Sequence, residues 1–203
     1  MRFPKWLVFA SLVLAVVLLG GCAHKVVSRI STDSTTDLSG RWNDTDSRLV
    51  ADEMIRDCLD RPWLIQHMEK SAGKKPVMIV GVIQNKSSEH IATGTFIGDI
   101  ERALVNSGKV DMVASPDERR QIREERSDQQ NYSSEETMKK WGQEKGADYM
   151  MGGVINTITD QEKGNSVVFY QVDLNLIHLQ DNSKVWLGQK KIKKFIGRGR
   201  ASY

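Results

Sequence analysis

The sequence predicts a single α+β domain, in which helices flank a mixed, mostly antiparallel sheet. Helix and strand patterns alternate over residues 44–145, whereas residues 149–195 contain only strand patterns separated by short turns. Parallel strands need long crossover connections and strands joined by tight turns pair antiparallel, so this order predicts a mixed sheet. About 180 residues follow an N-terminal signal, which is enough for one well-buried core.

The first 21 residues have the pattern of a secretory signal peptide. Two cations precede an apolar run over residues 6–19, and the sequence Leu-Gly-Gly-Cys closes the run at Cys22. The run is shorter than the roughly 20 residues of a membrane-spanning helix. The last four residues resemble a bacterial lipobox, so we expect residues 1–21 to be removed and Cys22 to be lipidated. The alternatives are an uncleaved anchor or an ordinary signal with a coincidental cysteine.

Residues 22–43 are predicted to be the lipidated N-terminus and a flexible tether. They are rich in Ser, Thr and Asp and show no sustained period. About twenty residues span at most about 65–70 Å when fully extended. By similarity to the bacterial sorting pattern, Ala23 in place of aspartate favours the outer membrane. The globular domain is then expected to face the periplasm on a lipid anchor.

The charge balance argues against a nucleic-acid partner. The chain has 29 basic and 26 acidic residues, and removal of the two cations of the signal leaves 27 against 26, a formal charge of +1. Such a balance does not imply a polyanionic partner. Once Cys22 is lipidated, Cys58 is the one remaining thiol, so the mature chain has no intramolecular disulfide.

Two helices are predicted at the start of the domain. Residues 44–59 place an apolar stripe on one helical face, and either Asp44 or Asp46 is placed to cap its N-terminus. The stripe consists of Leu49, Val50, Met54, Ile55, Cys58 and Leu59. Cys58 is therefore expected to be a buried, inert thiol. A second helix begins at Pro62 and runs to about Lys70.

The middle of the chain alternates between strands and helices. The apolar run 77–83 predicts a central strand buried on both faces. A helix over 94–106 and a short strand over 109–113 follow, and together these segments predict a crossover unit. Capping boxes precede two further helices, a highly charged one over 116–128 that we expect at the surface and one over 134–145.

The last third of the chain predicts three antiparallel strands. They cover residues 149–159, 167–179 and 184–195, with turns at Gly164-Asn165 and Asp181-Asn182. The second strand alternates cleanly, so one face is expected in the core and the other in water. The core set consists of Val168, Tyr170, Val172, Leu174 and Leu176.

No catalytic, cofactor or metal pattern can be placed in its required context. Ser71 and Lys74 have the S-x-x-K spacing of penicillin-recognising enzymes, but the partner motifs are absent from the sequence. Gly152-Gly153 inside a strand indicates a bulge or a close backbone approach rather than a phosphate cradle. The histidines are dispersed along the chain, without a cysteine or carboxylate at ligand spacing. They are His24, His67, His90 and His178. We therefore expect no enzymatic activity, cofactor or metal.

Two features are candidates for partner binding. The basic stretch near the C-terminus contains Lys190, Lys191, Lys193 and Lys194, followed by Arg198 and Arg200 in the tail 197–203. It is either a solvated edge strand, in which lysines prevent edge-to-edge aggregation, or a contact with an acidic domain or anionic cell-wall material. Trp42, at the junction of tether and domain, either fills the domain's own core or binds a partner.

Several stretches of this sequence, in this order behind a lipobox, resemble LpoB-type lipoproteins, the activators of penicillin-binding proteins. They are Leu38–Arg48, Asp57–Leu64, Ala147–Gly153, Tyr170–Leu174 and Lys184–Lys194. The resemblance covers roughly residues 38–196, which contain the predicted globular domain, 44–196. The tether here is short and contains no proline, whereas the best-studied members carry a long Pro-rich linker.

The resemblance implies a fold related to the N-terminal domain of TolB. It also implies a monomeric outer-membrane lipoprotein that binds a bifunctional class A penicillin-binding protein and stimulates its synthesis of peptidoglycan. It carries over no particular docking residue. A second hypothesis is a structural or export-associated lipoprotein that assembles oligomers through a TolB-like or curli-secretion-like domain.

Overall fold

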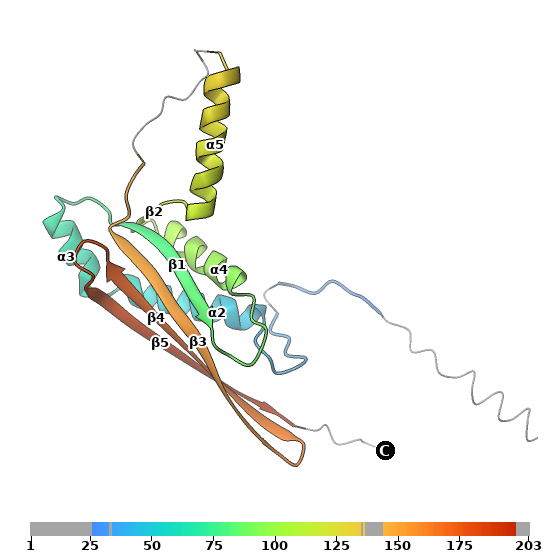
Figure 1. Cartoon of the computed structure of the whole chain (residues 1–203). Helices are drawn as coiled ribbons and strands as arrows, with labels where there is room; N and C mark the ends of the chain where they lie inside the picture. The colour runs from blue at the N-terminus through green and yellow to red at the C-terminus, as the bar shows by residue number, and fades with distance from the viewer. Residues whose placement is uncertain (1–25, 33, 135, 137–143, 198–203) are drawn as a thin grey trace, which may run out of the picture. The chain divides into compact units, whose positions relative to one another are not determined.

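The computed structural model describes residues 26–32, 34–134, 136 and 144–197. The signal segment and Cys22 lie outside these ranges, as does most of the helix predicted at 134–145. No helix in the described ranges is long and apolar enough to span a membrane. The helices and strands of the described residues all belong to a unit that begins at Thr35 (Figure 1). They are α2 (Asp44–Leu59), α3 (Pro62–Lys70), β1 (Val77–Asn85), α4 (Thr93–Asn106), β2 (Asp111–Met112), α5 (Pro116–Tyr132), β3 (Tyr149–Glu162), β4 (Asn165–His178) and β5 (Lys184–Ile196).

The strands form one mixed sheet in the order β2-β1-β3-β4-β5. β1 pairs in parallel with both β2 and β3, whereas β3–β4 and β4–β5 are long antiparallel pairs. Figure 1 shows α2 and α4 on the same face of this sheet. We call this the covered face, and the opposite one the open face, because no described helix packs on it. The predicted mixed α+β fold is confirmed.

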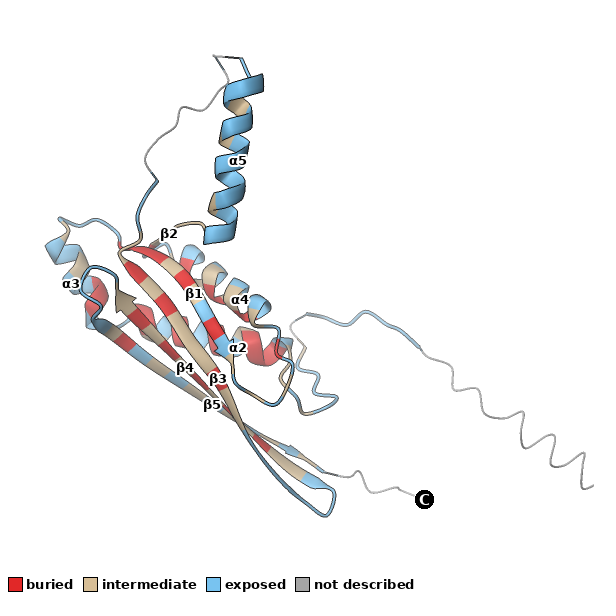
Figure 2. Ribbon diagram, viewed as in Figure 1, coloured by how far each residue is buried: buried red, intermediate tan, exposed pale blue. Residues whose placement is uncertain are grey.

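The core lies between the covered face and the helices. The inward side chains of β4, from Val168 to Leu176, are at most 4% exposed, which confirms the predicted alternation. Phe96, Ile100 and Leu104 of α4 pack into the same cluster. Figure 2 shows the buried residues as bands that alternate along the strands. The apolar side chains at every second residue of the strand therefore pack against those at helical spacing on α4, and together they form one apolar layer.

The strand β1 corrects one prediction. Its continuous apolar run was expected to be buried on both faces, but Val82 is 74% exposed because the helices cover only one face. Gly81 and Val82 together oppose the single residue Gly152, which makes a β-bulge. Next to it, a Cβ on Gly153 would lie 2.3 Å from the carbonyl oxygen of Asp173. The predicted close backbone approach is confirmed, and the bulged strand is β1.

Helix α2 has the predicted bounds but a different cap. Asn43 is the N-cap; its side chain accepts a hydrogen bond from the Asp46 amide, and the Asp46 carboxylate accepts one from the Asn43 amide, both at 3.0 Å. Leu49 was predicted on the apolar stripe but is 52% exposed, because it lies at the margin of that stripe. Cys58 is fully buried as expected, and burial raises the pKa of its thiol to about 12.

The β3–β4 hairpin turns at Lys163-Gly164, one residue before the predicted turn. Both residues have positive φ, +49° and +84°, as in the two-residue turns that match the twist of paired strands. The charged helix α5 begins with the predicted capping box of Ser115 and Glu118 and extends to Tyr132. It buries none of its residues (Figure 2), which confirms the prediction that it lies at the surface.

Candidate functional site

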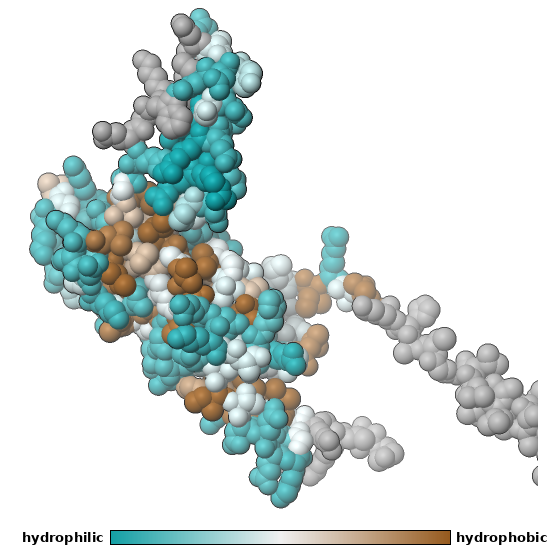
Figure 3. All heavy atoms as spheres, viewed as in Figure 1, coloured by the Kyte–Doolittle hydropathy of each residue, from teal (hydrophilic) through white to brown (hydrophobic). Residues whose placement is uncertain are grey.

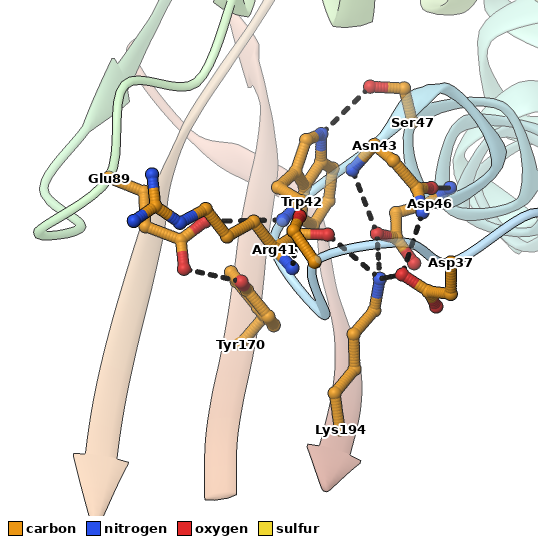
Figure 4. Close-up of polar contacts among 10 residues, drawn as sticks. Asp37, Arg41, Trp42, Asn43, Asp46, Ser47, Glu89, Tyr170 and Lys194 are labelled. Carbon is orange, nitrogen blue, oxygen red and sulfur yellow. Dashed lines mark hydrogen bonds and ion pairs between the residues drawn. The ribbon is translucent and has the colours of Figure 1, made fainter. Parts of the chain in front are cut away.

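The segment Asp37–Asn43, which we call the strap, lies against the domain (Figure 4). It belongs to the sequence that was assigned to the flexible tether. In the structure its polar groups form hydrogen bonds with α2, with β5 and with the loop between β1 and α4. Trp42 and Lys194, two of the predicted partner-binding candidates, make most of these contacts.

Lys194 joins the strap to the start of α2. Its Nζ donates hydrogen bonds to Asp46 Oδ2 at 2.6 Å, to the Arg41 carbonyl oxygen at 3.0 Å and to Asp37 Oδ1 at 3.1 Å. The ammonium group has three N–H donors, so this set satisfies all of them. The side chain of Lys194 is 10% exposed and that of Asp46 is 11% exposed. Lys194 is therefore a structural cation that fastens the strap.

Trp42 packs into the domain's own core. Its ring meets Phe96 and Tyr170 edge-on, with ring centroids 6.0 and 5.6 Å away, and its Nε1 donates to Ser47 Oγ at 2.9 Å. The Glu89 carboxylate accepts the Trp42 amide at 3.1 Å and the Tyr170 hydroxyl at 2.7 Å. Burial and then the Glu89 carboxylate raise the pKa of Tyr170. Of the two predicted roles for Trp42, the geometry favours the core.

The four lysines of β5 divide between the two faces of the sheet. Lys190 and Lys194 point to the covered face, where Lys190 pairs with Glu53 of α2. Lys191 and Lys193 are exposed on the open face and have no ion pair with a described residue. β5 is an edge strand, as the solvated-edge interpretation requires. The four lysines are thus half structural and half free surface, whereas Arg198 and Arg200 of the predicted basic stretch lie outside the described residues.

The open face carries an exposed apolar cluster beside the two unpaired lysines. Strand register places Phe169 between Ile158 and Lys193, and places Val167 beside Phe195. Ile158 and Phe195 are 67% and 70% exposed. In Figure 3, brown residues gather near the tip of the β3–β4 hairpin. We call this set the outer patch: Ile158, Val167, Phe169, Lys191, Lys193 and Phe195.

A polar cavity of about 370 Å³ lies at the other end of the sheet, beside α3 and the β4–β5 turn. Tyr149 is one of its lining residues, and the Tyr149 hydroxyl is 3.1 Å from His67 Nδ1. The Tyr149 ring centroid is 5.0 Å from that of His178. His178 Nδ1 in turn lies 2.9 Å from Asp181 Oδ1. Burial, followed by the nearby Asp148 carboxylate, raises the pKa of Tyr149.

The histidines are dispersed along the sequence, but the fold brings two of them together at this cavity. His67 and His178 are far apart in the sequence, yet both pack against Tyr149. The spacing of His178 and Asp181 is the one local signal that could have found part of the cluster. Among the described residues, no group of three or more His, Cys, Asp or Glu side chains is arranged to hold a metal ion.

The S-x-x-K pair does not form an active-site arrangement. Ser71 is the C-cap of α3, and its carbonyl oxygen accepts the amide of Lys74 in the following turn. The acylation motif instead requires the serine at the start of a helix. Ser71 lines the margin of the polar cavity, but Lys74 is exposed.

The described residues thus form an α+β domain with a strapped N-terminal segment, one covered face and one open face that carries apolar and cationic groups. Such a surface is typical of proteins that act by binding another protein. The chain belongs to the family described as peptidoglycan-synthase activator LpoB, whose model matches residues 46–192. The match begins in the first turn of α2 and ends within β5. It includes Lys190 and Lys191 but neither Trp42 nor Phe195.

Solved structures of low sequence identity are also similar to this chain. The C-terminal domain of LpoB from Salmonella enterica is 14% identical, with 72% of this chain and 98% of that chain covered and a TM-score of 0.41. The NMR structure of E. coli LpoB is 12% identical, with 86% and 83% covered and a TM-score of 0.41. Lipoprotein GNA1162 from Neisseria meningitidis is 12% identical, with 63% and 88% covered and a TM-score of 0.36. No curated protein sequence is significantly similar to the chain.

Proposed function

We propose that this chain is an outer-membrane lipoprotein that binds a bifunctional class A penicillin-binding protein and stimulates its synthesis of peptidoglycan. Membership of the peptidoglycan-synthase activator family carries the proposal, because the match covers the folded domain from α2 to β5. The chain would act by contact between proteins and without a cofactor. Lipidation at Cys22 would hold it at the membrane, since several acyl chains together bind a bilayer far more firmly than one.

The strap has a consequence for the reach of the domain. Because residues 37–43 are fastened to the domain by Lys194 and Trp42, the segment between Cys22 and the strap comprises residues 23–36. Fourteen residues (36 − 23 + 1) span at most about 50 Å when fully extended. The domain would therefore meet its synthase within a short distance of the membrane that holds Cys22.

Reconstitution with the synthase tests the proposal. The lipidated chain, purified in detergent, is added to a class A penicillin-binding protein from the same cells, and glycan polymerisation and peptide cross-linking are followed on a lipid-linked substrate. We expect at least one of the two rates to rise and the synthase to be enriched when the chain is used as bait on solubilised membranes. The activator proposal fails if no synthase is enriched and both rates stay unchanged. A stable ring in sizing experiments would instead favour the oligomeric, export-associated alternative.

The lipid anchor has its own test. A Cys22→Ser variant should no longer incorporate labelled palmitate and should leave the outer-membrane fraction, because serine has no thiol to acylate. A matched Cys58→Ser variant should keep both label and membrane association. Label on the Cys22→Ser chain would place the acylation site elsewhere.

A further inference from the structure

The apolar side chains of the outer patch are exposed to water, although neighbouring side chains on the same strands are buried on the covered face. Phe169 and Tyr170 are neighbours on β4, yet Tyr170 is fully buried and Phe169 remains partly exposed. Phe195, at the end of the edge strand, is 70% exposed. Aromatic side chains grouped on an otherwise polar surface are a frequent mark of a binding site. The patch therefore has the apolar centre that a protein interface needs.

The cations of the patch lack counter-charges among the described residues. The inward Lys190 and Lys194 each contact carboxylates, whereas Lys191 and Lys193 contact none. Asp173, the nearest acid along this face of β4, already accepts hydrogen bonds from Gln171 and Gln189. Two acids of β3 lie on this face at the hairpin end, Asp160 opposite Val167 and Glu162 opposite Asn165, and neither forms an ion pair with Lys191 or Lys193.

This charge distribution selects the kind of partner. If two copies of the chain met through the outer patch about a two-fold axis, the lysine pair of one copy would lie near the same lysine pair of the other copy. Like charges in contact are repulsive. Lysines on an edge strand also oppose edge-to-edge pairing of sheets. An apolar surface with a carboxylate rim would instead match both components of the patch.

We propose that the outer patch is the surface on which an acidic protein domain docks. Phe169 and Phe195 would fill apolar recesses of that domain, while Lys191 and Lys193 would pair with its carboxylates. The inference rests on the proposed function, since it names the face through which the chain would bind the synthase. The strap and Lys194 would support the patch from the covered side without touching the partner.

Two matched pairs of variants test the assignment, with binding of the lipidated full chain to the detergent-solubilised synthase as the readout. Lys191→Glu/Lys193→Glu is compared with Lys74→Glu/Lys75→Glu, which makes the same charge change on exposed lysines after α3. Phe195→Ser is compared with Leu187→Ser, which is 69% exposed at the other end of β5. We expect each outer-patch variant to raise the Kd for the synthase by about tenfold, and each control to bind like the wild type. Binding of Lys191→Glu/Lys193→Glu should also depend less on salt.

The outcomes separate the face from the function. If the wild type binds the synthase and all four variants bind equally well, the outer patch is the wrong face while the proposed function stands. If the wild type does not bind, the proposed function fails first. Thermal unfolding of each variant shows whether lost binding reflects lost folding. A shift of oligomeric state in the outer-patch variants would assign the patch to a second copy, and an effect confined to binding of isolated peptidoglycan would assign it to the cell wall; either result overturns the proposal.

Discussion

The two faces of the sheet use similar side chains for different purposes. On the covered face Lys194 donates three hydrogen bonds and Tyr170 is fully buried. One residue away on the same strands, Lys193 has no ion pair with a described residue and Phe169 remains partly exposed. The covered face therefore maintains the fold and the strap, whereas the open face is available for binding. The difference teaches that residue type and local sequence are insufficient to assign a role on a strand that alternates between faces.

The largest expected effect comes from truncating the two neighbouring aromatic residues on β4, one on each face of the sheet. Tyr170→Ala should lower the free energy of unfolding by about 3–5 kcal/mol, because it leaves a cavity beneath Trp42. It also removes the hydroxyl that donates a hydrogen bond to Glu89. Phe169→Ala should cost about 1 kcal/mol or less, because its ring is only partly removed from water. Urea unfolding followed by circular dichroism measures both. Equal losses would contradict the division between the faces.

The next effect concerns the lysines of β5. Lys194→Met should destabilise the domain by about 1–3 kcal/mol, since it leaves the largely buried Asp46 carboxylate without its cation. Limited proteolysis should then cut near Asp37, because the strap loses its fastening. The adjacent Lys193→Met is the control, and we expect its stability to change by less than about 0.5 kcal/mol. A strap that stays protected in Lys194→Met would show that Trp42 alone holds it.

Thiol accessibility sharpens the comparison without disturbing the fold. In a Cys22→Ser chain, Cys58 should react with iodoacetamide at pH 8 only after unfolding in urea, because it is fully buried and burial raises its pKa to about 12. A cysteine introduced on the open face by Leu187→Cys should react at once. Rapid labelling of Cys58 in the folded chain would indicate that the helices open readily over the core.

The smallest effect is a pH dependence at the contact between α2 and β5. The Asp57 carboxylate accepts hydrogen bonds from Arg61 and from Trp186 Nε1, and these contacts, Arg61 first, lower its pKa below the ordinary 3.8. A lowered pKa stabilises the fold above pH 3.8, and this contribution is lost as the pH falls through the folded-state value. The stability of the Asp57→Asn variant should therefore fall less steeply than that of the wild type as the pH drops below about 4. An unchanged limb in thermal scans from pH 2 to 7 would contradict this role.

Much of the fold could be predicted because it depends on neighbouring residues. The limits of α2 and α3, the Ser115–Glu118 capping box and the burial of Cys58 all follow from periodicity or from contacts within one helical turn. Membership of the activator family is likewise carried by short stretches in a fixed order. The turn at Lys163-Gly164 was misplaced by one residue, because Gly164-Asn165 has equally suitable turn residues.

The candidate site depends on contacts that no local pattern contains. Lys194 meets Asp37 and Asp46 across most of the chain, and Tyr149 brings His67 and His178 together. Likewise, an apolar strand such as β1 does not itself specify whether helices cover one face of the sheet or both. The sequence by itself determined the signal pattern, the elements and the alternation along the strands. Only the tertiary structure decided which lysines are structural and which are free, because that choice is made by strand register and by the packing of α2 and the strap on a single face.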